Sequence, residues 1–334
     1  MQVWQISSFG IDSLQLVERP ASEPGPGQVR VKVGAVSFNY RDLMMVKGLY
    51  NPKLHLPRVP CSDGAGEVDA VGEGVTRWKT GDRVAGIFMQ NWIDGPPTPV
   101  KVKGALGGDV DGMLADHVVL SEHGLVEMPR HLSFEEAATL PCAALTAWNA
   151  LATGEVKPGS TVLIQGTGGV SIFALQFARL KGARVLGISG SEEKLERAIS
   201  LGLDAGLNYR EHPDWDRWAM DETGGEGVDL IVEVGGQGTF GRSLRAIRMG
   251  GTIAQVGVLS SSAEPLAVPS ILHKQARIQG IYVGSRSDFV DMNKAISLTR
   301  LRPVGANFHW AQAREVLTRM EHASHFGKLV VTVE

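Results

Sequence analysis

The feature that most constrains the fold is a glycine-rich turn between an apolar run and a stretch with helical spacing. Val162–Ile164 suits a buried strand, and apolar side chains recur at helical spacing over residues 170–181. Glycines in such a turn let the backbone approach the pyrophosphate of a dinucleotide, and the free N–H groups of the helix bind its negative charge. Ser171 stands at the third glycine position, where its small side chain still allows close packing. The predicted cofactor-binding residues of the turn are Gly166, Thr167, Gly168, Gly169 and Val170.

The surrounding segments alternate between strands and helices. After the turn we predict a strand at 183–188, a helix at 191–201 and further strands at 228–234 and 252–258. Strands that read as nearly unbroken Val, Ile and Leu are buried on both faces, which is typical of a parallel sheet covered by helices. The fold class predicted here is α/β, with a doubly wound parallel sheet in residues 125–284.

The two flanking regions differ from this pattern. Residues 1–124 contain short alternating runs such as Val29–Val33, separated by glycine and proline turns, which indicates a β-rich barrel or sandwich. Residues 285–334 hold one helix and one strand and are too few for an independent core. We therefore expect 1–124 and 285–334 to form one domain, into which 125–284 is inserted. Residues 89–111 form a long irregular stretch, expected to be a mobile loop near a site.

Composition excludes several classes of protein. The 334 residues carry a net charge of −3 with no basic tract, which argues against a nucleic-acid partner. Cys61 and Cys142, the two cysteines, cannot build a disulfide framework or a four-thiolate zinc site. Residues 158–178 carry no charge, but a strand, a turn and a helix explain them better than a membrane span. Without a signal-peptide pattern at the start, we expect a soluble cytoplasmic protein.

The strand after the turn bears on the choice of cofactor. An NAD site places an acidic residue at its end, where the carboxylate accepts from the ribose 2′-hydroxyl. Ser189 occupies that position here, and its neutral side chain does not repel a 2′-phosphate. Lys194 and Tyr209–Arg210 are candidate phosphate ligands, although Lys194 also fits a solvated surface position. Glu192 and Glu193 favour NADH, but on balance we predict NADPH.

Several further motifs accompany the turn and carry a resemblance. They are Gly64–Val68, Gly81–Val84, Leu140–Trp148 and Val156–Gly159. With these motifs the chain resembles the medium-chain dehydrogenase/reductase superfamily, and within it the zinc-free quinone oxidoreductase-like branch. The resemblance implies a GroES-like β-rich catalytic domain with an inserted Rossmann domain, an active site in the cleft between them, and a dimer or tetramer; we expect a homodimer.

The same resemblance allows the zinc sites to be examined. Zinc-dependent members hold the catalytic metal with Cys, His and Cys, and the matching positions here are Asn39, Ser62 and Cys142. Only the thiol binds zinc well, whereas a catalytic site needs about three protein ligands. The structural zinc lobe of the family needs four cysteines, and residues 89–111 contain none. We therefore predict no zinc, and treat Cys142 as a buried small residue.

Candidate residues for the reaction follow from the resemblance. Asn39 is expected to hydrogen-bond the substrate carbonyl or the cofactor, Tyr50 to donate a proton or to form a cavity wall, and Thr146 to face the nicotinamide. Asp42 has a second reading, in which it only orients Arg41. The predicted substrate-binding residues are Tyr40, Asp42 and Trp92, and the further cofactor contacts are Gly257, Val258, Leu259, Val283, Ser285 and Arg286.

These residues predict an NADPH-dependent oxidoreductase that passes a hydride to a quinone or to the β-carbon of an α,β-unsaturated carbonyl compound. The cofactor carries the hydride, and the protein supplies binding, orientation and a partner for the developing oxyanion. Two alternatives stay open. One is a zinc-independent alcohol dehydrogenase or carbonyl reductase, and the other is a protein that binds NADPH as a sensor without turnover.

Overall fold

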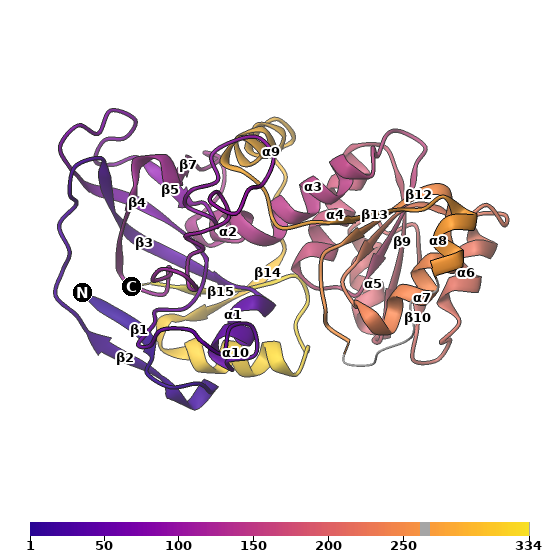
Figure 1. Ribbon diagram of the computed structural model, residues 1–334, viewed down its shortest axis with the longest axis horizontal. Helices are drawn as coiled ribbons and strands as arrows, with labels where there is room; N and C mark the ends of the chain where they lie inside the picture. Colours follow the sequence, from indigo (N-terminus) through magenta and orange to yellow (C-terminus); the bar gives the residue numbers. More distant parts are fainter. Residues whose placement is uncertain (261–267, 334) are drawn as a thin grey trace. The chain divides into compact units, whose positions relative to one another are not determined.

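The chain divides into two compact units in the computed structural model, which describes residues 1–260 and 268–333 (Figure 1). The first unit comprises residues 1–145 and 283–334, and the second comprises residues 146–282. The first boundary therefore lies later than the one expected at residue 124. The reason is that β7 (Leu125–Glu127) pairs with β5 (Arg83–Gly86), and α2 (Phe134–Ala138) packs on the same sheet.

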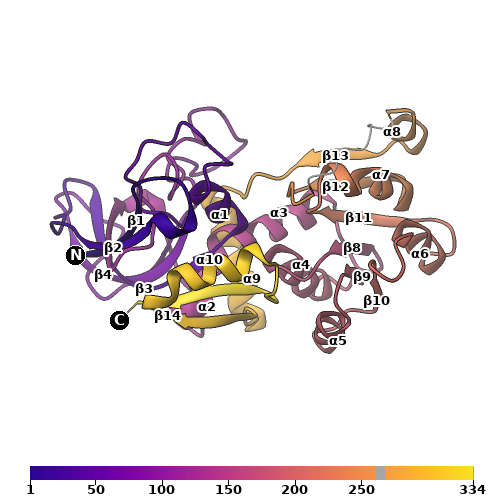
Figure 2. The same ribbon diagram turned by 90° about the horizontal axis from the view of Figure 1, so that it is seen from below.

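The second unit is a six-stranded parallel sheet with the order β10-β9-β8-β11-β12-β13. Helices α4 and α5 lie on one face of the sheet and α6 and α7 on the other (Figure 2), as predicted for a doubly wound fold. Its strands are β8 (Thr161–Gln165), β9 (Arg184–Ser189), β10 (Ala205–Asn208), β11 (Val228–Glu233), β12 (Ile247–Gln255) and β13 (Arg277–Gly280). Its helices are α3 (Leu145–Thr153), α4 (Gly169–Leu180), α5 (Glu192–Ser200), α6 (Trp215–Glu222), α7 (Gln237–Ala246) and α8 (Val268–Lys274).

The strand order of this sheet reverses between β8 and β11. The chain leaves β8 in one direction through α4 and β9, and β11 continues the sheet on the opposite side. In open α/β sheets, ligands bind beyond the carboxyl ends of the strands at such a point. The turn at residues 166–169 follows β8 there, which places it where a dinucleotide would bind.

The first unit is built on a mixed sheet with the order β14-β15-β3-β4-β5-β7, to which β6 adds by pairing with β3. Because β15 pairs antiparallel with β3, the end of the chain completes the sheet begun by the first region. Its remaining strands are β1 (Gln2–Ile6), β2 (Leu14–Glu18), β3 (Gln28–Phe38), β4 (Asp63–Val71), β6 (His117–Ser121), β14 (Gly305–His309) and β15 (Lys328–Thr332). Its further helices are α1 (Tyr40–Val46), α9 (Arg286–Thr299) and α10 (Ala313–Glu321).

The stretch 89–111 is irregular, as predicted, but its ends are held together. Met89 bridges to Ala105, and Leu106 bridges to Val110. Met89, Ala105 and Leu106 are also buried. The stretch is thus a folded loop that encloses part of its own apolar surface.

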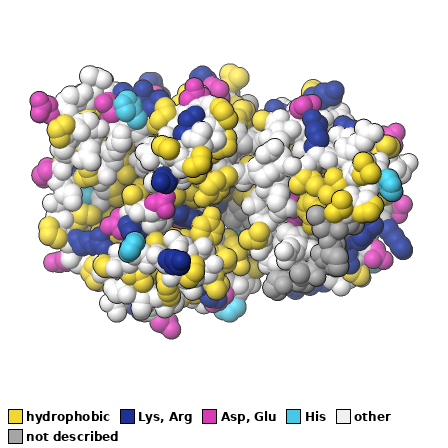
Figure 3. Space-filling view, in the orientation of Figure 1, with side chains coloured by type: hydrophobic (Ala, Val, Ile, Leu, Met, Phe, Trp, Pro, Cys, Tyr) yellow, Lys and Arg dark blue, Asp and Glu magenta, His cyan; other side chains and the backbone are white. Residues whose placement is uncertain are grey.

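Exposed hydrophobic side chains gather on the second unit around α8 and the edge strand β13 (Figure 3). All four residues of β13 are exposed, and Leu272 of α8 is 73% exposed. Among the described residues, no helix is long and apolar enough to cross a membrane. The uncharged run 158–178 is a strand, a turn and a helix, as expected.

Candidate functional site

A buried polar cluster lies at the end of β3, where the chain turns into α1. Asn39 is the N-cap of this helix, and its backbone N–H donates to Asp42 Oδ2 at 2.8 Å. The pair forms a capping box, because the Asn39 side chain also accepts from the backbone of Asp42. Asp42 is fully buried, so the predicted substrate contact is replaced by a structural role. Its Oδ1 lies 3.7 Å from the Arg41 guanidinium, which agrees with the second reading of this residue.

Ser62 and Cys142, the other two residues expected to match zinc-ligand positions, lie in the same cluster. The Asn39 Nδ2 donates to Ser62 Oγ over a long 3.4 Å, and Ser62 Oγ donates to Asp63 Oδ1 at 2.7 Å. Asp63 Oδ2 accepts from the backbone N–H of Cys142 at 3.0 Å. Cys142 lies in a π-helical turn, a local widening that is frequent at functional sites. The structure thus gathers Asn39, Ser62 and Cys142, far apart in the sequence, around the carboxylate of Asp63.

Lys328, the first residue of β15, completes the cluster and was missed by the sequence analysis. Its side chain is buried, and its Nζ donates to Asn39 Oδ1 at 2.5 Å and to Phe38 O at 2.6 Å. The signal that could have revealed it is a charged residue that opens an otherwise apolar strand. A buried ammonium requires partners of this kind, because an uncompensated charge in the protein interior is very costly.

Burial dominates the electrostatics of this cluster. It raises the pKa of Asp42 to about 6, against the opposing effect of Arg41. Burial also raises the pKa of Asp63, while Lys328 and the hydrogen bonds from Ser62, Asn39 and Cys142 lower it. The pKa of the Cys142 thiol is raised by desolvation and by Asp63. The cluster therefore contains two carboxyl groups, Asp42 and Asp63, whose ionised forms are destabilised by burial, together with one ammonium group.

The cluster does not fit a zinc ion. Its members at the ligand positions are a carboxamide, a hydroxyl and one thiol, whereas a catalytic zinc ion needs about three thiolate, imidazole or carboxylate ligands. The Lys328 ammonium already contacts the oxygen of Asn39, and a second cation beside it would be repelled. Among the residues that the structure describes, no group of three His, Cys, Asp or Glu side chains is suited to a metal ion.

Arg41 links the predicted residue Tyr50 to the loop 89–111. The guanidinium carbon lies 4.8 Å from the centre of the Phe88 ring and 5.7 Å from that of Tyr50, and Nη1 donates to Leu106 O at 2.6 Å. Tyr50 is 47% exposed, so its hydroxyl is accessible to a substrate while its ring rests on the guanidinium. Tyr40 is likewise exposed.

The side chain of Trp92 is not open to a substrate, as a predicted substrate-binding residue would be. Its side chain is buried, and its indole N–H donates to Gly95 O at 2.8 Å within the loop. The loop backbone around it is tied to the start of α9, where Arg286 N donates to Trp92 O. Trp92 therefore holds the loop together.

The glycine-rich turn in the second unit has the geometry that a pyrophosphate needs. Gly166 has φ +69°, a conformation that favours glycine, and no atom lies within 4 Å of a Cβ built at Gly166 or Gly168. Gly168 is the N-cap of α4 and provides no side-chain cap, so the first N–H groups of the helix remain available to an anion. Thr167 is buried, and Gly169 and Val170 begin the helix. These residues fit the phosphates of a dinucleotide.

Ser171 explains how the turn works without its third glycine. Its side chain is buried, and Oγ donates to Gln165 O at 2.6 Å. The hydroxyl is thus satisfied by the carbonyl group at the end of β8.

Two buried polar side chains, Gln165 and Glu233, connect the end of β8 to the end of β11, and the sequence analysis did not identify either of them. Gln165 Nε2 donates to Glu233 Oε2 at 2.7 Å, and Gln165 Oε1 accepts from Val234 N and Gly235 N. Each is the last residue of its strand, β8 or β11, and follows a run of three apolar residues. The signal is similar to that of Lys328, which stands directly before such a run. The hydrogen bonds hold together the two loops that lie at the reversal of strand order.

Four of the predicted phosphate-binding groups gather at the end of β9. Ser189 pairs in register with Asn208, so Tyr209 and Arg210 emerge beside it. A Cβ on Gly190 would lie 2.9 Å from Tyr209 Oη and 2.8 Å from Arg210 Nε, so both side chains rest against this glycine. Partial burial lowers the pKa of Lys194, and Arg197 and Arg210 lower it further, against Glu193.

The remaining predicted residues fall into both units. Leu259 and Val258 are exposed, and Gly257 packs so closely that a Cβ would lie 2.4 Å from Val234 O. Thr146 is buried in α3. In the first unit, Val283 has φ +61°, Ser285 caps α9 through Asp288, and Arg286 Nη1 donates to His123 O at 3.1 Å. The Ser285 hydroxyl and one Arg286 nitrogen are therefore already engaged within the first unit.

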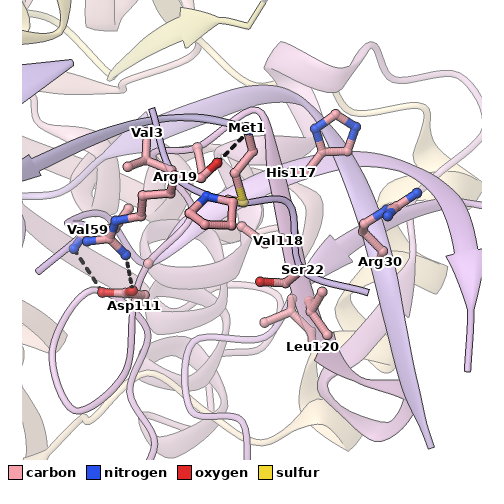
Figure 4. Close-up of a pocket in the computed structure, with 14 residues that line it drawn as sticks. Met1, Val3, Arg19, Ser22, Arg30, Val59, Asp111, His117, Val118 and Leu120 are labelled. Atoms are coloured by element: carbon pink, nitrogen blue, oxygen red, sulfur yellow. Dashed lines mark hydrogen bonds and ion pairs between the residues drawn. The ribbon is translucent and has the colours of Figure 1, made fainter. Parts of the chain in front are cut away.

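A separate cavity of about 210 Å³ lies on the first unit, between the start of the chain and β6 (Figure 4). Arg19, which lines it, forms an ion pair with Asp111, and Arg30 pairs with Asp69 and Glu23. None of the predicted site residues lines this cavity. It is distinct from the candidate site.

Models of known protein families match segments of both units. An alcohol dehydrogenase GroES-like domain matches residues 25–130, and a zinc-binding dehydrogenase model matches residues 169–298. A zinc-type alcohol dehydrogenase-like protein of Schizosaccharomyces pombe is 43% identical, over 97% of this chain and 96% of its own length. An acryloyl-coenzyme A reductase of Metallosphaera sedula is 29% identical, over 93% of each chain.

Solved structures show the same architecture. An NAD-dependent alcohol dehydrogenase superposes with a TM-score of 0.91 at 35% identity, over 100% of each chain. A quinone oxidoreductase of Pseudomonas syringae pv. Tomato DC3000 superposes with a TM-score of 0.85 at 26% identity, over 99% of each chain. The chain therefore belongs to the medium-chain dehydrogenase/reductase superfamily and is an NAD(P)-dependent oxidoreductase.

Proposed function

We propose that this oxidoreductase uses NADPH, works without zinc, and reduces a quinone or an α,β-unsaturated carbonyl compound. One observation carries the proposal. Asn39, which by the resemblance matches a zinc-ligand position of zinc-dependent members, has a carboxamide whose oxygen accepts from the buried ammonium group of Lys328. Quinones and enones spread the charge that develops on reduction over a conjugated system, so hydrogen-bond donors are sufficient to stabilise it.

The chain's own residues would divide the work between binding and polarisation. The backbone N–H groups at the start of α4 would bind the pyrophosphate, and Tyr209, Arg210 and Lys194 the 2′-phosphate beside Ser189. The reduced nicotinamide supplies the hydride when it is bound. Asn39 Nδ2 would donate to the substrate oxygen, and Tyr50 would donate a hydrogen bond or a proton to the same oxygen.

A second candidate is an alcohol dehydrogenase or carbonyl reductase that works without metal. It is favoured by the alcohol dehydrogenases among the similar proteins, one of them described as NAD-dependent. A sensor that binds NADPH without turnover is the third possibility.

The proposal is tested by titrating chelator-treated protein with NADPH and NADH, followed by turnover assays with quinones, enones and primary alcohols. We expect NADPH to bind at least about tenfold more tightly, since one charge-assisted phosphate contact is worth at least that much. Preferential NADH binding would assign the ribose to Glu192 or Glu193. Activity that appears only after zinc is added would contradict the metal-free reaction, and binding without turnover would favour the sensor.

Replacing Tyr50 by Phe is expected to lower kcat by about tenfold and to leave the NADPH dissociation constant unchanged, because one hydrogen bond to the developing oxyanion is lost. The ring would keep its place on Arg41, so the loop should stay intact. Steady-state kinetics with one enone and one quinone measure the effect, with Tyr282→Phe, an exposed tyrosine of the second unit, as the matched control. An unchanged kcat would make Tyr50 a wall of the substrate site.

The exposed edge strand β13 supports the further proposal of a homodimer. An edge strand with exposed apolar side chains is prone to pair with a strand of another chain along its open side. Ile278 and Tyr282 are each at least 40% exposed on or just after this edge. Sedimentation of the wild type and of an Ile278→Lys variant would measure the oligomeric state.

A further inference from the structure

We infer that Lys328 is a positioning residue that sets the direction in which the Asn39 carboxamide donates. This inference rests on the proposed function, in which Asn39 binds the substrate oxygen. An asparagine carboxamide can present either its oxygen or its nitrogen to a neighbour. An ammonium group only donates hydrogen bonds. A lysine beside the carboxamide therefore favours the orientation that presents the carboxamide oxygen to it and disfavours the one that presents the nitrogen.

The contacts around Lys328 satisfy this requirement. Nζ donates to Asn39 Oδ1 at 2.5 Å, and a second bond to Phe38 O at 2.6 Å holds the ammonium at the end of β3. The side chain is only 3% exposed, so water does not compete effectively for these bonds. The capping contact with the backbone of Asp42 favours the same orientation, and the lysine adds the charged partner of Oδ1. With Oδ1 engaged, Nδ2 must point away from the lysine, toward Ser62.

The orientation of Nδ2 has a chemical consequence. Nδ2 bonds the Asp63 carboxylate as well as Ser62 Oγ. The contact with Ser62 is 3.4 Å, longer than an ordinary hydrogen bond, so a substrate oxygen at a shorter distance would replace that contact readily. An amide whose oxygen accepts from a cation is also polarised, and its N–H groups become stronger donors through cooperativity. Lys328 would thus supply positive charge to the substrate oxygen through Asn39, at the position where zinc-dependent members use their metal.

The buried carboxylates explain how the lysine is tolerated at this place. Asp63 lies in the same cluster and is bonded to Ser62 and Cys142. Asp42 is paired with Arg41 and bonded to the backbone of Asn39. Two carboxylates, one guanidinium and one ammonium give a cluster whose ionised charges cancel. The arrangement keeps the ammonium in place without neutralising it by a direct ion pair.

A double-mutant cycle tests whether Lys328 acts through Asn39. Lys328→Met and Asn39→Ala are each expected to lower kcat for the acceptor by about tenfold, with little change in KM or NADPH affinity. In the Asn39→Ala background, Lys328→Met should change kcat by less than about twofold, because residues that act as a unit are not additive. Lys32→Met, an exposed lysine on β3, is the matched control. Additive effects in an active enzyme would overturn the inference.

A second measurement does not depend on turnover. In protein labelled at asparagine, the Asn39 ¹³Cγ and ¹⁵Nδ2 resonances are assigned by their loss in Asn39→Ala. They should move in Lys328→Met and stay in place in Lys32→Met. Unchanged resonances would overturn the positioning role whatever reaction the protein performs, whereas failure to reduce quinones or enones would contradict the proposed function alone. Should Lys328→Met not fold, Lys328→Gln removes the charge and retains a donor, and the same comparisons apply.

Discussion

Gly168→Asp is expected to weaken NADPH binding by about a hundredfold or more while leaving the fold at least as stable as the wild type. The substitution places a carboxylate at the N-cap of α4, where the pyrophosphate would bind. Two like charges about 4 Å apart repel by about 4 kcal/mol at an effective dielectric constant of 20, which exceeds the roughly 2.7 kcal/mol that a hundredfold loss requires.

The structure indicates that this variant folds. Gly168 has φ −77° and ψ −179°, an extended conformation open to any residue, and no atom lies within 4 Å of its Cβ position. Aspartate is also a preferred N-cap residue and carries a charge that suits the start of a helix. Thermal unfolding without cofactor should therefore show no loss of stability.

The matched control is Gly168→Ser, which adds a capping hydroxyl of similar position without the charge. It should bind NADPH far better than Gly168→Asp in a fluorescence titration. Equal affinities for the two variants and the wild type would show that the cofactor phosphates do not lie at this turn.

The stability of Asp42→Asn relative to the wild type is expected to increase by about 2 kcal/mol as the pH rises from 4 to 7. Burial raises the pKa of Asp42 from 3.8 to about 6, and a difference of one in a pKa corresponds to about 1.4 kcal/mol. Between these two values the native state binds more protons than the unfolded state, so the wild type loses stability as the pH rises. Asparagine does not ionise, so the variant escapes this loss.

The variant keeps the local structure intact. An asparagine at position 42 can still accept from the backbone N–H of Asn39 through its carboxamide oxygen, so the start of α1 remains capped. Its neighbours Arg41, Asp63 and Lys328 would feel the lost charge at every pH at which Asp42 is ionised. The pKa of about 6 already includes the opposing effects of Arg41 and Lys328, so the expected gain is what remains after these contacts are lost.

Urea unfolding of both proteins across this pH range measures the difference, with the exposed residue Asp12 replaced by Asn as the control for loss of a negative charge. A difference that is independent of pH would mean that Asp42 ionises in the native state as it does in the unfolded chain. A difference of opposite sign would mean that the Arg41 contact outweighs the cost of burial.

Much of the fold followed from local patterns. The apolar strand before Gly166 and the helical spacing after Gly169 predicted β8, the turn and α4 almost to the residue, because strand and helix periodicity and glycine turns are short-range properties. The helix predicted at 191–201 corresponds to α5 for the same reason, and the Ser191 side chain caps it by accepting from Lys194 N. The domain boundary was less accessible, since residues 125–145 join the first unit only through the pairing of β7 with β5.

For the phosphate-binding candidates, the sequence identifies the residues but not the contacts between them. Ser189 and Tyr209 could be named from their places at the ends of two strands, but the contact of Tyr209 and Arg210 with Gly190 depends on the pairing of those strands. Asp42 was predicted to bind substrate, whereas its burial and capping bond make it structural. Burial depends on what packs above a residue, which no local pattern reports.

The sequence alone determined the parallel α/β unit, the dinucleotide-type turn and the lack of zinc-binding side chains at Asn39 and Ser62, because each depends on the identity or spacing of nearby residues. Only the tertiary structure revealed the buried polar cluster in which Asn39 and Ser62 lie. Lys328 lies 289 residues from Asn39 in the chain, and the pairing of β15 with β3 brings its ammonium to the Asn39 carboxamide. A buried charge is tolerated only where its partners converge, and that convergence is a property of the folded chain.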